Sequence, residues 1–469
     1  MRKSLFVIAI LFACTSLIAC KKDDSTKRIT TGTIKERLNK LQRVESFKTI
    51  ASNERFPLVA KIQFKQYIDH DNPKLGTFSQ TIELGFHGFD ATNVLVTNGY
   101  MNYDNYSGYA GENELAFLLD GNYLTVEHRY FGNSLPVEID YNNTDTWKYL
   151  TTEQAAADYH DIVKEFKRIL DGKWISTGGS KSGMTTEMFA LYHPGDVDLY
   201  VPYVAPFCNS FADKRMIKFL NEETGDLQYG EARAKAIRDE VLAFQVKLLE
   251  YRDVLAPKFY QEGIASGAKY STSATQDLLY DAAVIEFGIG FWQYYQPTTD
   301  VENCLAMSES SSKQSACYKV LTSVIEPNEM GIDNDFTPYY VQAYQELGNY
   351  GYDFHYIREA LTGDAHLVVT EEQEATLNWD LVLNDSEKTL PQKELMYTKI
   401  NNMLATTDQQ FVIIYGSSDP WYSVRPDDIS GRDNISTYVN TRHPHTSTIS
   451  NFDKLTKNEI LNKIKTILA

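Results

Sequence analysis

Apolar residues follow two different periods along the chain. From residue 58 to residue 204, short apolar runs typical of β-strands alternate with segments of helical period. The strand-like runs lie at residues 58–68, 78–86, 93–97, 123–127, 174–177 and 199–204. The first two predict an antiparallel hairpin. The later runs, separated by helical segments such as 153–170, predict a parallel sheet with helices on both faces.

Beyond residue 206 the helical period takes over. Aromatic-rich helical stretches are predicted at 232–255, 275–295 and 339–346, and no strand pattern returns before the runs at 411–415 and 437–439, which precede a closing helix at 454–468. A length of 469 residues fits one α/β core that carries an insertion. We therefore predict a core at 48–206 and 406–469, with a helical cap at 207–405 inserted between core strands.

A strand, a glycine pair, a serine and a helix succeed one another in KWISTGGSKSGMTT, residues 173–186. This is the pattern of a nucleophile elbow, where a strand reverses into a helix so sharply that only small residues fit beside the nucleophile. Gly178 and Gly179 would give that space to Ser180. The usual G-x-S-x-G pattern places a glycine where this chain has Ser182. A Gly/Ser-rich loop without chemistry is the alternative interpretation.

A serine nucleophile needs a histidine base and a carboxylate that orients the histidine. In the α/β-hydrolase fold, which the strand order and the elbow together predict, the chain order is serine, acid, histidine. Asp419 follows the 411–415 strand and is the predicted acid. The predicted base is His445, because the loop after the last strand is long enough there to return over Ser180. His443 remains the alternative base.

An oxyanion hole needs two backbone N–H groups. The N–H of Lys181 directly follows the nucleophile, and the second donor is expected from Gly99 or Tyr100, in the loop after the 93–97 strand. A simple tight turn is an equal interpretation of the Asn98-Gly99 pair.

The N-terminus has the pattern of a bacterial lipoprotein signal. Basic residues precede an apolar stretch, and Cys20 directly follows a small residue, which predicts a signal at 1–19, lipid attachment on Cys20 and a tether at 20–47. The alternative is an ordinary signal peptide cleaved near Ala19. Residues 21–24 (KKDD) resemble a surface-export signal of Gram-negative lipoproteins, or are a solvated charge run. We expect an outer-membrane anchor in a Gram-negative envelope.

The composition of the chain excludes some classes of binding partner. With 43% hydrophobic and 13% aromatic residues the chain is globular, and its net charge of −18 argues against nucleic acid. No second stretch is apolar enough to span a membrane. No Cys/His cluster has metal-ligand spacing, so we predict no metal and no cofactor. Cys304 and Cys317 predict either a disulfide or two buried free thiols. Nothing in the sequence indicates an oligomeric state.

Several ordered segments resemble one family. They are NVLVTNGY (93–100), VEHRYFGNSLP (126–136), TGGSKSGMT (177–185), FGIGFWQYY (287–295) and GSSDPW (416–421). On these residues the chain resembles the secreted bacterial tripeptidyl aminopeptidases, serine peptidases similar to the lysosomal prolyl carboxypeptidase and dipeptidyl peptidase II group. The resemblance implies that Ser180, Asp419 and His445 are nucleophile, acid and base, and that peptides are the substrates.

An enzyme that acts at N-termini must bind an α-ammonium group, for which hydrogen bonds to a charged group contribute about 1.5 to 3 kcal/mol each. Glu286 in the cap is the candidate anchor, and Trp292 is a candidate for the wall of the substrate pocket; a solvated glutamate and a packing aromatic are the alternatives. Beside a peptidase that forms an acyl-enzyme on Ser180, two hypotheses stay open. One is an esterase on the same triad, and the other is an inactive surface binding lipoprotein of hydrolase fold.

Overall fold

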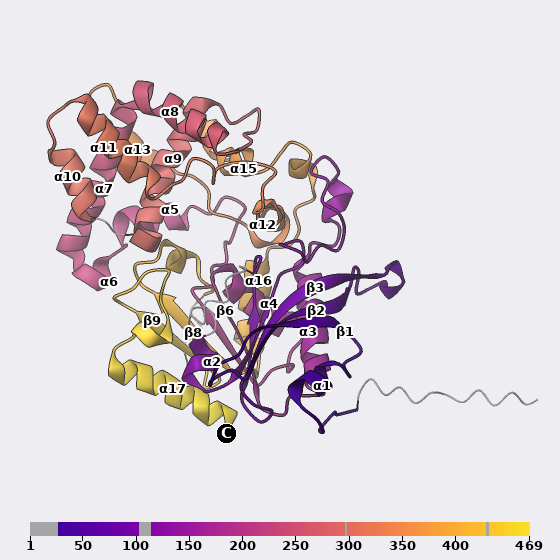
Figure 1. Ribbon diagram of the computed structural model, residues 1–469. Coiled ribbons are helices and arrows are strands. Elements are labelled where there is room, and N and C mark those ends of the chain that lie inside the picture. Colours follow the sequence, from indigo (N-terminus) through magenta and orange to yellow (C-terminus); the bar gives the residue numbers. More distant parts are fainter. Residues whose placement is uncertain (1–26, 103–113, 296–297, 428–430) are drawn as a thin grey trace, which may run out of the picture.

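One mixed β-sheet runs through the centre of the protein. The computed structural model describes residues 27–102, 114–295, 298–427 and 431–469. Its nine-stranded sheet has the strand order β1-β2-β3-β5-β4-β6-β7-β8-β9 (Figure 1). The strands are β1 (Val44–Ala51), β2 (Leu58–Tyr67), β3 (Thr77–Phe86), β4 (Asn93–Thr97), β5 (Asn122–Val126), β6 (Trp174–Gly179), β7 (Leu199–Tyr203), β8 (Phe411–Gly416) and β9 (Ile435–Asn440). The pairs β1–β2, β2–β3 and β3–β5 are antiparallel. The pairs β4–β5, β4–β6, β6–β7, β7–β8 and β8–β9 are parallel. The fold class predicted from the sequence, an α/β-hydrolase, is confirmed.

Helices cover both faces of the sheet and make a second layer beyond one end of it. They are α1 (Ile34–Leu38), α2 (Glu114–Leu118), α3 (Thr152–Phe166), α4 (Lys181–Tyr192), α5 (Arg215–Glu222), α6 (Asp226–Tyr229), α7 (Glu231–Glu250), α8 (Arg252–Ala265), α9 (Gln276–Gly290), α10 (Thr298–Ala306), α11 (Ser311–Thr322), α12 (Thr337–Gln342), α13 (His355–Ala360), α14 (Glu371–Glu374), α15 (Leu377–Val382), α16 (Met396–Thr406) and α17 (Lys454–Leu468). None of the helices in the described ranges is both long and apolar enough to cross a bilayer.

Alternating residues of the central strands feed two separate cores. In β4, Leu95 packs in the cluster that includes α3 and α4, whereas Val94 and Val96 pack in the cluster that includes α2 and α17. This division follows from the strand period of two, which points successive side chains to opposite faces. Because both faces are covered, β7 and β8 are buried along their whole length and have the uninterrupted apolar sequences typical of parallel strands.

The segment between β7 and β8 contains helices α5 to α16, joined by loops, and no strand among its described residues. In Figure 1 the helices from α5 to α15, coloured magenta to orange, lie above the sheet, whereas α16 packs beside α4. Helix α17 and the C-terminus lie at the opposite end. The π-helical turn η4 (Phe291–Tyr295) and α5 pack against η7 (Pro420–Val424), the short helix that follows β8. The helical segment therefore stands over the carboxyl ends of the core strands.

The N-terminal part of the core begins earlier than the sequence predicts. The residues assigned to a tether contain α1 and the start of β1, and Ile34, Leu38 and Leu41 are buried against the core. β1 lies at the edge of the sheet with mostly exposed side chains, so it carries little of the apolar pattern that marks the inner strands. Residues 1–26, with the predicted signal and Cys20, lie outside the described residues.

Two predicted helices in the cap also end earlier than expected. The stretch 232–255 is divided at Tyr251 into α7 and α8, and the stretch 275–295 continues as α9 only to Gly290 before the π-helical turn.

Of the two alternatives for Cys304 and Cys317, the structure has the free thiols. Both cysteines are buried, Cys304 on α10 and Cys317 on α11. The packing of two separate helices sets the distance between the sulfur atoms, which sequence proximity does not reveal.

A buried acid on α4 makes stability depend on pH. Burial raises the pKa of the Glu187 carboxyl from its usual value to about 8, and neither of its oxygens has a hydrogen-bond partner among the described residues. The folded state therefore holds this proton at pH values where the unfolded chain releases it. The resulting stabilisation is complete below the usual pKa and is lost as the pH rises through about 8.

We expect Glu187→Gln to raise the melting temperature at pH 9 and to leave it nearly unchanged at pH 5, because Gln resembles the protonated acid. The difference in unfolding free energy at pH 9 should be a few kcal/mol, on the order of what such a pKa shift implies. Calorimetry of both proteins in a Ser180→Ala background, which prevents autolysis, measures it. Parallel melting-temperature curves across this pH range would contradict the assignment.

Candidate active site

Ser180 stands at a sharp reversal between β6 and α4. Its φ of 57° and ψ of −125° are unusual for a residue with a side chain, and such a conformation costs on the order of 1–3 kcal/mol. The Ser180 N–H donates a hydrogen bond of 2.9 Å to the carbonyl oxygen of Tyr203, in β7. The neighbouring strand thus holds the reversal in place. This conformation is typical of a nucleophile elbow.

Two glycines make the reversal possible, and they are not the pair expected from the sequence. A Cβ atom on Gly178 would lie 2.5 Å from Cβ of Ser182, and one on Gly183 would lie 2.7 Å from the carbonyl oxygen of Tyr203. Gly179 has open space where its Cβ would be. The close approaches thus fall on Gly178, where the strand meets the helix, and on Gly183, where the helix meets β7.

The predicted acid and base lie side by side. Oδ2 of Asp419 is 2.7 Å from Nδ1 of His445, and Oδ1 of Asp419 accepts a hydrogen bond from the N–H of Trp421. Because a carboxylate only accepts, the proton of the imidazole lies on Nδ1, and Nε2 carries the lone pair. Nε2 is buried and has no hydrogen-bond partner within the described parts of the chain. It is therefore available to take a proton.

All three predicted triad residues follow the carboxyl ends of parallel strands. Ser180 follows β6, Asp419 follows β8 and His445 follows β9, so the three are at the same edge of the sheet. This edge is where α/β sheets place their ligand sites.

The loop that carries His445 packs closely against the end of β8. A Cβ atom on Gly416 would lie 2.1 Å from the carbonyl oxygen of Pro444 and 2.4 Å from that of His443. The hydroxyl of Ser447 closes the loop with a 2.8 Å hydrogen bond to the Pro444 carbonyl. This packing brings His445, rather than the alternative His443, to Asp419.

The residues expected to form the oxyanion hole are tied to one another. Lys181 is the first residue of α4, so its N–H has no partner one turn earlier in the helix and suits an oxyanion. The Gly99 N–H, however, donates to Oγ of Ser182 at 3.0 Å, and the Tyr100 N–H donates to Oδ1 of Asn98 at 3.1 Å. The structure therefore does not present either of these as a free second donor. Ser182, in place of the usual glycine, supplies the acceptor that engages Gly99.

The side chain of Lys181 also binds Gly99. Its Nζ donates a 2.6 Å hydrogen bond to the Gly99 carbonyl and lies over the rings of Tyr100, Phe131 and Tyr339, at 5.1, 4.7 and 5.7 Å from their centroids. Burial holds the pKa of this ammonium group well below its usual value. The two residues after the nucleophile thus form hydrogen bonds with both the N–H and the carbonyl group of Gly99. Sequence reasoning missed these side-chain roles, although a lysine and a serine at the elbow were visible.

Glu286 lines a cavity of about 120 Å³ between the cap helices. The hydroxyl groups of Tyr350 and Tyr352 donate to Oε1 of Glu286 at 2.5 and 2.7 Å. Burial raises the pKa of Glu286; the two tyrosine hydrogen bonds oppose this, and the charge of Glu329, which also lines the cavity, adds to it.

Aromatic contacts connect this cavity with the loops that follow β4 and β8. The ring of Tyr350 packs edge-on against Trp421, two residues after the acid, with centroids 5.4 Å apart. On the other side, Tyr340 in the cavity wall contacts Tyr339, which in turn contacts Tyr100 of the loop after β4, at 5.1 and 5.8 Å. The cavity therefore lies next to the carboxyl edge of the sheet.

Trp292 is not among the residues that line this cavity; it lines a separate cavity of about 30 Å³ in the cap, and its place in the substrate pocket stays a prediction. The indole is buried inside the cap, where it contacts Tyr229 and leaves no space for a side chain on Gly225. Tyr294, two residues later, is half exposed and packs edge-on against the ring of His445 at 5.7 Å. Both residues belong to the π-helical turn η4, which has Trp292 in the interior of the cap and Tyr294 against the histidine.

The family assignment follows from the whole matched length. Residues 33–448 match the family model described as PS-10 peptidase S37. The chain belongs to this family. The match includes the elbow, the acid and the histidine, and it confirms the resemblance to serine peptidases that the sequence segments indicated.

Curated relatives match over shorter stretches. The prolyl tri/tetrapeptidyl aminopeptidase of Streptomyces mobaraensis is 30% identical over 289 residues, which are 61% of this chain and 56% of that enzyme. The chain thus spans about half the length of that relative. The human lysosomal Pro-X carboxypeptidase is 36% identical over 74 residues, 15% of each chain. Among solved structures, the proline iminopeptidase of Mycobacterium smegmatis aligns with a TM-score of 0.38 at 11% identity, over 87% of this chain and 99% of that one.

We expect Ser182→Ala to lower kcat about tenfold or more and to change KM little, because Gly99 would lose its acceptor and the loop beside the reacting carbonyl would shift. Hydrolysis of a p-nitrophenyl ester and of a free-amine peptide p-nitroanilide measures both constants. Ser176→Ala is the matched control, since Ser176 is a buried serine on β6 whose hydroxyl has no hydrogen-bond partner among the described residues. Equal kinetics of the two variants would refute the positioning role.

Proposed function

We propose that this family member is a serine exopeptidase that releases short peptides, tripeptides foremost, from the N-termini of its substrates. The observation that carries the proposal is the cavity with two glutamates, Glu286 and Glu329, whose wall residue Tyr350 packs against Trp421 in the loop of the acid. A triad alone is common to peptidases and esterases, whereas an acidic cavity at a fixed distance from the scissile bond would select a free N-terminus. The printed name of the Streptomyces mobaraensis relative, an aminopeptidase, also supports it.

The chemistry would proceed in two acyl-transfer steps. Nε2 of His445 takes the proton of the Ser180 hydroxyl while Oγ attacks the scissile carbonyl, and Asp419 stabilises the imidazolium that forms. The Lys181 N–H donates to the developing oxyanion. The imidazolium then gives its proton to the leaving amine, and the C–N bond breaks. Water, activated by the same imidazole, hydrolyses the ester on Ser180 and releases the short peptide.

The charge of the cavity favours a cationic guest. Glu286 and Glu329 both line it, and none of the described residues in its wall is a lysine or an arginine. Burial raises the pKa of both carboxyl groups, and the positive charge of an α-ammonium would oppose this by stabilising their charged form. A carboxylate accepts more hydrogen bonds than the two that Tyr350 and Tyr352 donate, so capacity for an ammonium group remains.

The two other hypotheses have less support. An esterase needs no acidic cavity beside its triad. The hypothesis of an inactive protein draws on Ser182, in place of the usual glycine, and on the unusual sequence Arg-His-Pro-His at residues 442–445. The hydroxyl of Ser182, however, has a specific partner in Gly99. That loop is also packed so that His445 contacts Asp419, which is the arrangement an active enzyme requires.

We further propose that a lipid on Cys20 anchors the protein in the outer membrane of a Gram-negative envelope, with display at the cell surface as the finer hypothesis from residues 21–24. The support is the sequence pattern alone, since these residues lie outside the described part of the chain. Metabolic labelling with a fatty-acid analogue tests it: the label should be incorporated into wild type and absent from Cys20→Ala, and equal labelling would refute the anchor.

We expect free-amine tripeptide p-nitroanilides to be cleaved and their N-acetylated counterparts to be resistant, because the acetyl group removes the charge that the cavity selects. Glu286→Gln should lower kcat/KM for the free-amine peptide about a hundredfold, the loss of one or two charge-assisted hydrogen bonds. The same variant should hydrolyse p-nitrophenyl acetate like wild type. Equal losses on both substrates would show that Glu286 supports the fold and does not anchor the substrate.

A further inference from the structure

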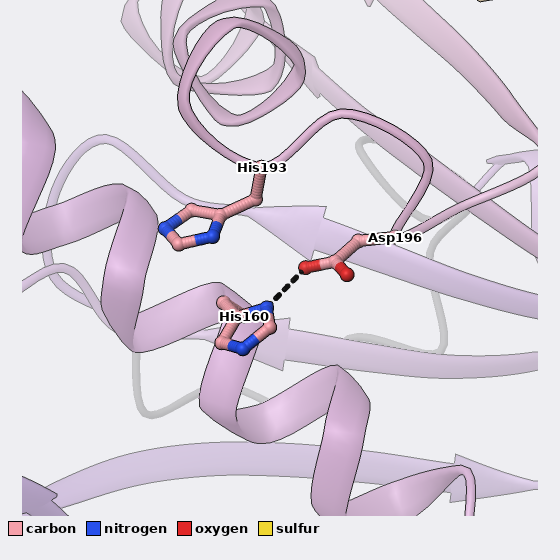
Figure 2. A group of neighbouring side chains, drawn as sticks. All are labelled: His160, His193 and Asp196. Carbon is pink, nitrogen blue, oxygen red and sulfur yellow. Dashed lines mark hydrogen bonds and ion pairs between the residues drawn. The ribbon is translucent and has the colours of Figure 1, made fainter.

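A cluster of metal-ligating side chains lies away from the triad. His160 comes from α3, His193 is the residue that caps the C-terminus of α4, and Asp196 lies in the loop that leads to β7 (Figure 2). One nitrogen of each histidine and one carboxylate oxygen all lie within 4.8 Å of one another. Sequence spacing gave no sign of this group, because His160 precedes the other two by a whole helix and a strand.

The three side chains already interact. Nδ1 of His160 is 2.6 Å from Oδ2 of Asp196, as drawn in Figure 2, and the two imidazole rings stack with centroids 4.5 Å apart and planes 17° apart. The hydrogen bond to Asp196 raises the pKa of His160, whereas burial and the neighbouring His160 lower that of His193. All three residues are partly exposed, so an ion can reach them from solvent.

We propose that His160, His193 and Asp196 bind one divalent transition-metal ion, with zinc as the best match. Two imidazole nitrogens and one carboxylate form a ligand set that zinc accepts, whereas magnesium and calcium prefer oxygen ligands. Three protein ligands leave a fourth position for water.

Binding requires the ligand side chains to rearrange. Zinc ligands at about 2.0–2.2 Å from the ion are about 3.3 Å apart in a tetrahedron. The three ligand atoms, which lie within 4.8 Å of one another, must therefore move closer together. The lone pair of an imidazole lies in the ring plane, so one histidine must turn out of the stack to point at a shared ion. His160 loses the proton that it shares with Asp196, and the ion replaces that hydrogen bond.

The backbone around the cluster limits how far the ligands can move. Nζ of Lys167 donates a 2.6 Å hydrogen bond to the Asp196 carbonyl, and the Gly195 N–H donates to Oε1 of Gln409 at 3.1 Å. The His193 N–H completes the last turn of α4 by donating to the carbonyl of Phe189 at 2.9 Å. The backbone of His193 and Asp196 is therefore held by hydrogen bonds, and that of His160 by helix α3.

The position of the cluster predicts a structural effect without a catalytic one. Helix α4 begins beside Ser180 and has 12 residues, so its far end, where His193 lies, is about 18 Å from the nucleophile. A bound ion would link α3 to the end of the helix that carries the elbow, and it would stabilise the fold without entering the reaction.

The test is a zinc titration of the full-length chain, purified without a histidine tag and treated with a chelator. We expect calorimetry to find one high-affinity equivalent that raises the melting temperature, and magnesium to have no such effect. Asp196→Asn and His193→Ala should each weaken zinc binding about tenfold or more. His355→Ala, an exposed histidine on α13, should bind zinc like wild type. The value of kcat should be equal in all four proteins.

A second measurement does not depend on folded variants. Cobalt(II) added to the wild-type chain should give the visible absorption bands of a four- or five-coordinate site, and zinc should displace it. Unchanged zinc affinity in Asp196→Asn and His193→Ala, or the absence of saturable binding and of cobalt bands in wild type, would overturn the proposal.

Discussion

The reversal of the backbone at Ser180 is the constraint on which the rest of the site depends. A serine with φ of 57° is held there because β7 takes its N–H and because Gly178 and Gly183 let β6, α4 and β7 approach within van der Waals contact. The same close approach places Lys181 and Ser182 against Gly99, so one turn of chain presents the nucleophile and fixes the neighbouring loop. Stored strain of this kind persists only where packing over-determines it.

The cap is part of the site and not only a cover. Two of its residues hold the acid loop: the Thr224 hydroxyl donates to the Ser418 carbonyl at 3.2 Å, and the Ser418 hydroxyl donates to Oε1 of Gln228 at 2.6 Å. Tyr294 packs against the base, and Glu286 lies in the adjoining cavity. In our account, the core supplies the acyl-transfer chemistry. The cap holds the loop of Asp419 in place and, as we propose, selects the substrates that reach Ser180.

Much of this could be predicted from the sequence, and the remainder could not for identifiable reasons. The inner strands and the order of Ser180, Asp419 and His445 were visible because buried parallel strands are uninterruptedly apolar and their chemistry follows their carboxyl ends. The edge strand β1 lacked that pattern. The partners of Gly99, the burial of Trp292 at a π-helical turn and the meeting of His160 with His193 depend on tertiary packing, which local periodicity does not encode.

The most direct test of the central claim is to find where a fluorophosphonate reacts. The full-length chain would be treated with the reagent, digested and mapped by mass spectrometry, in parallel with His445→Ala. Our account predicts one phosphonylated serine, Ser180, and labelling slower by orders of magnitude in the variant, because the base that activates the hydroxyl would be missing. Label on another serine, or equal labelling without His445, would contradict it.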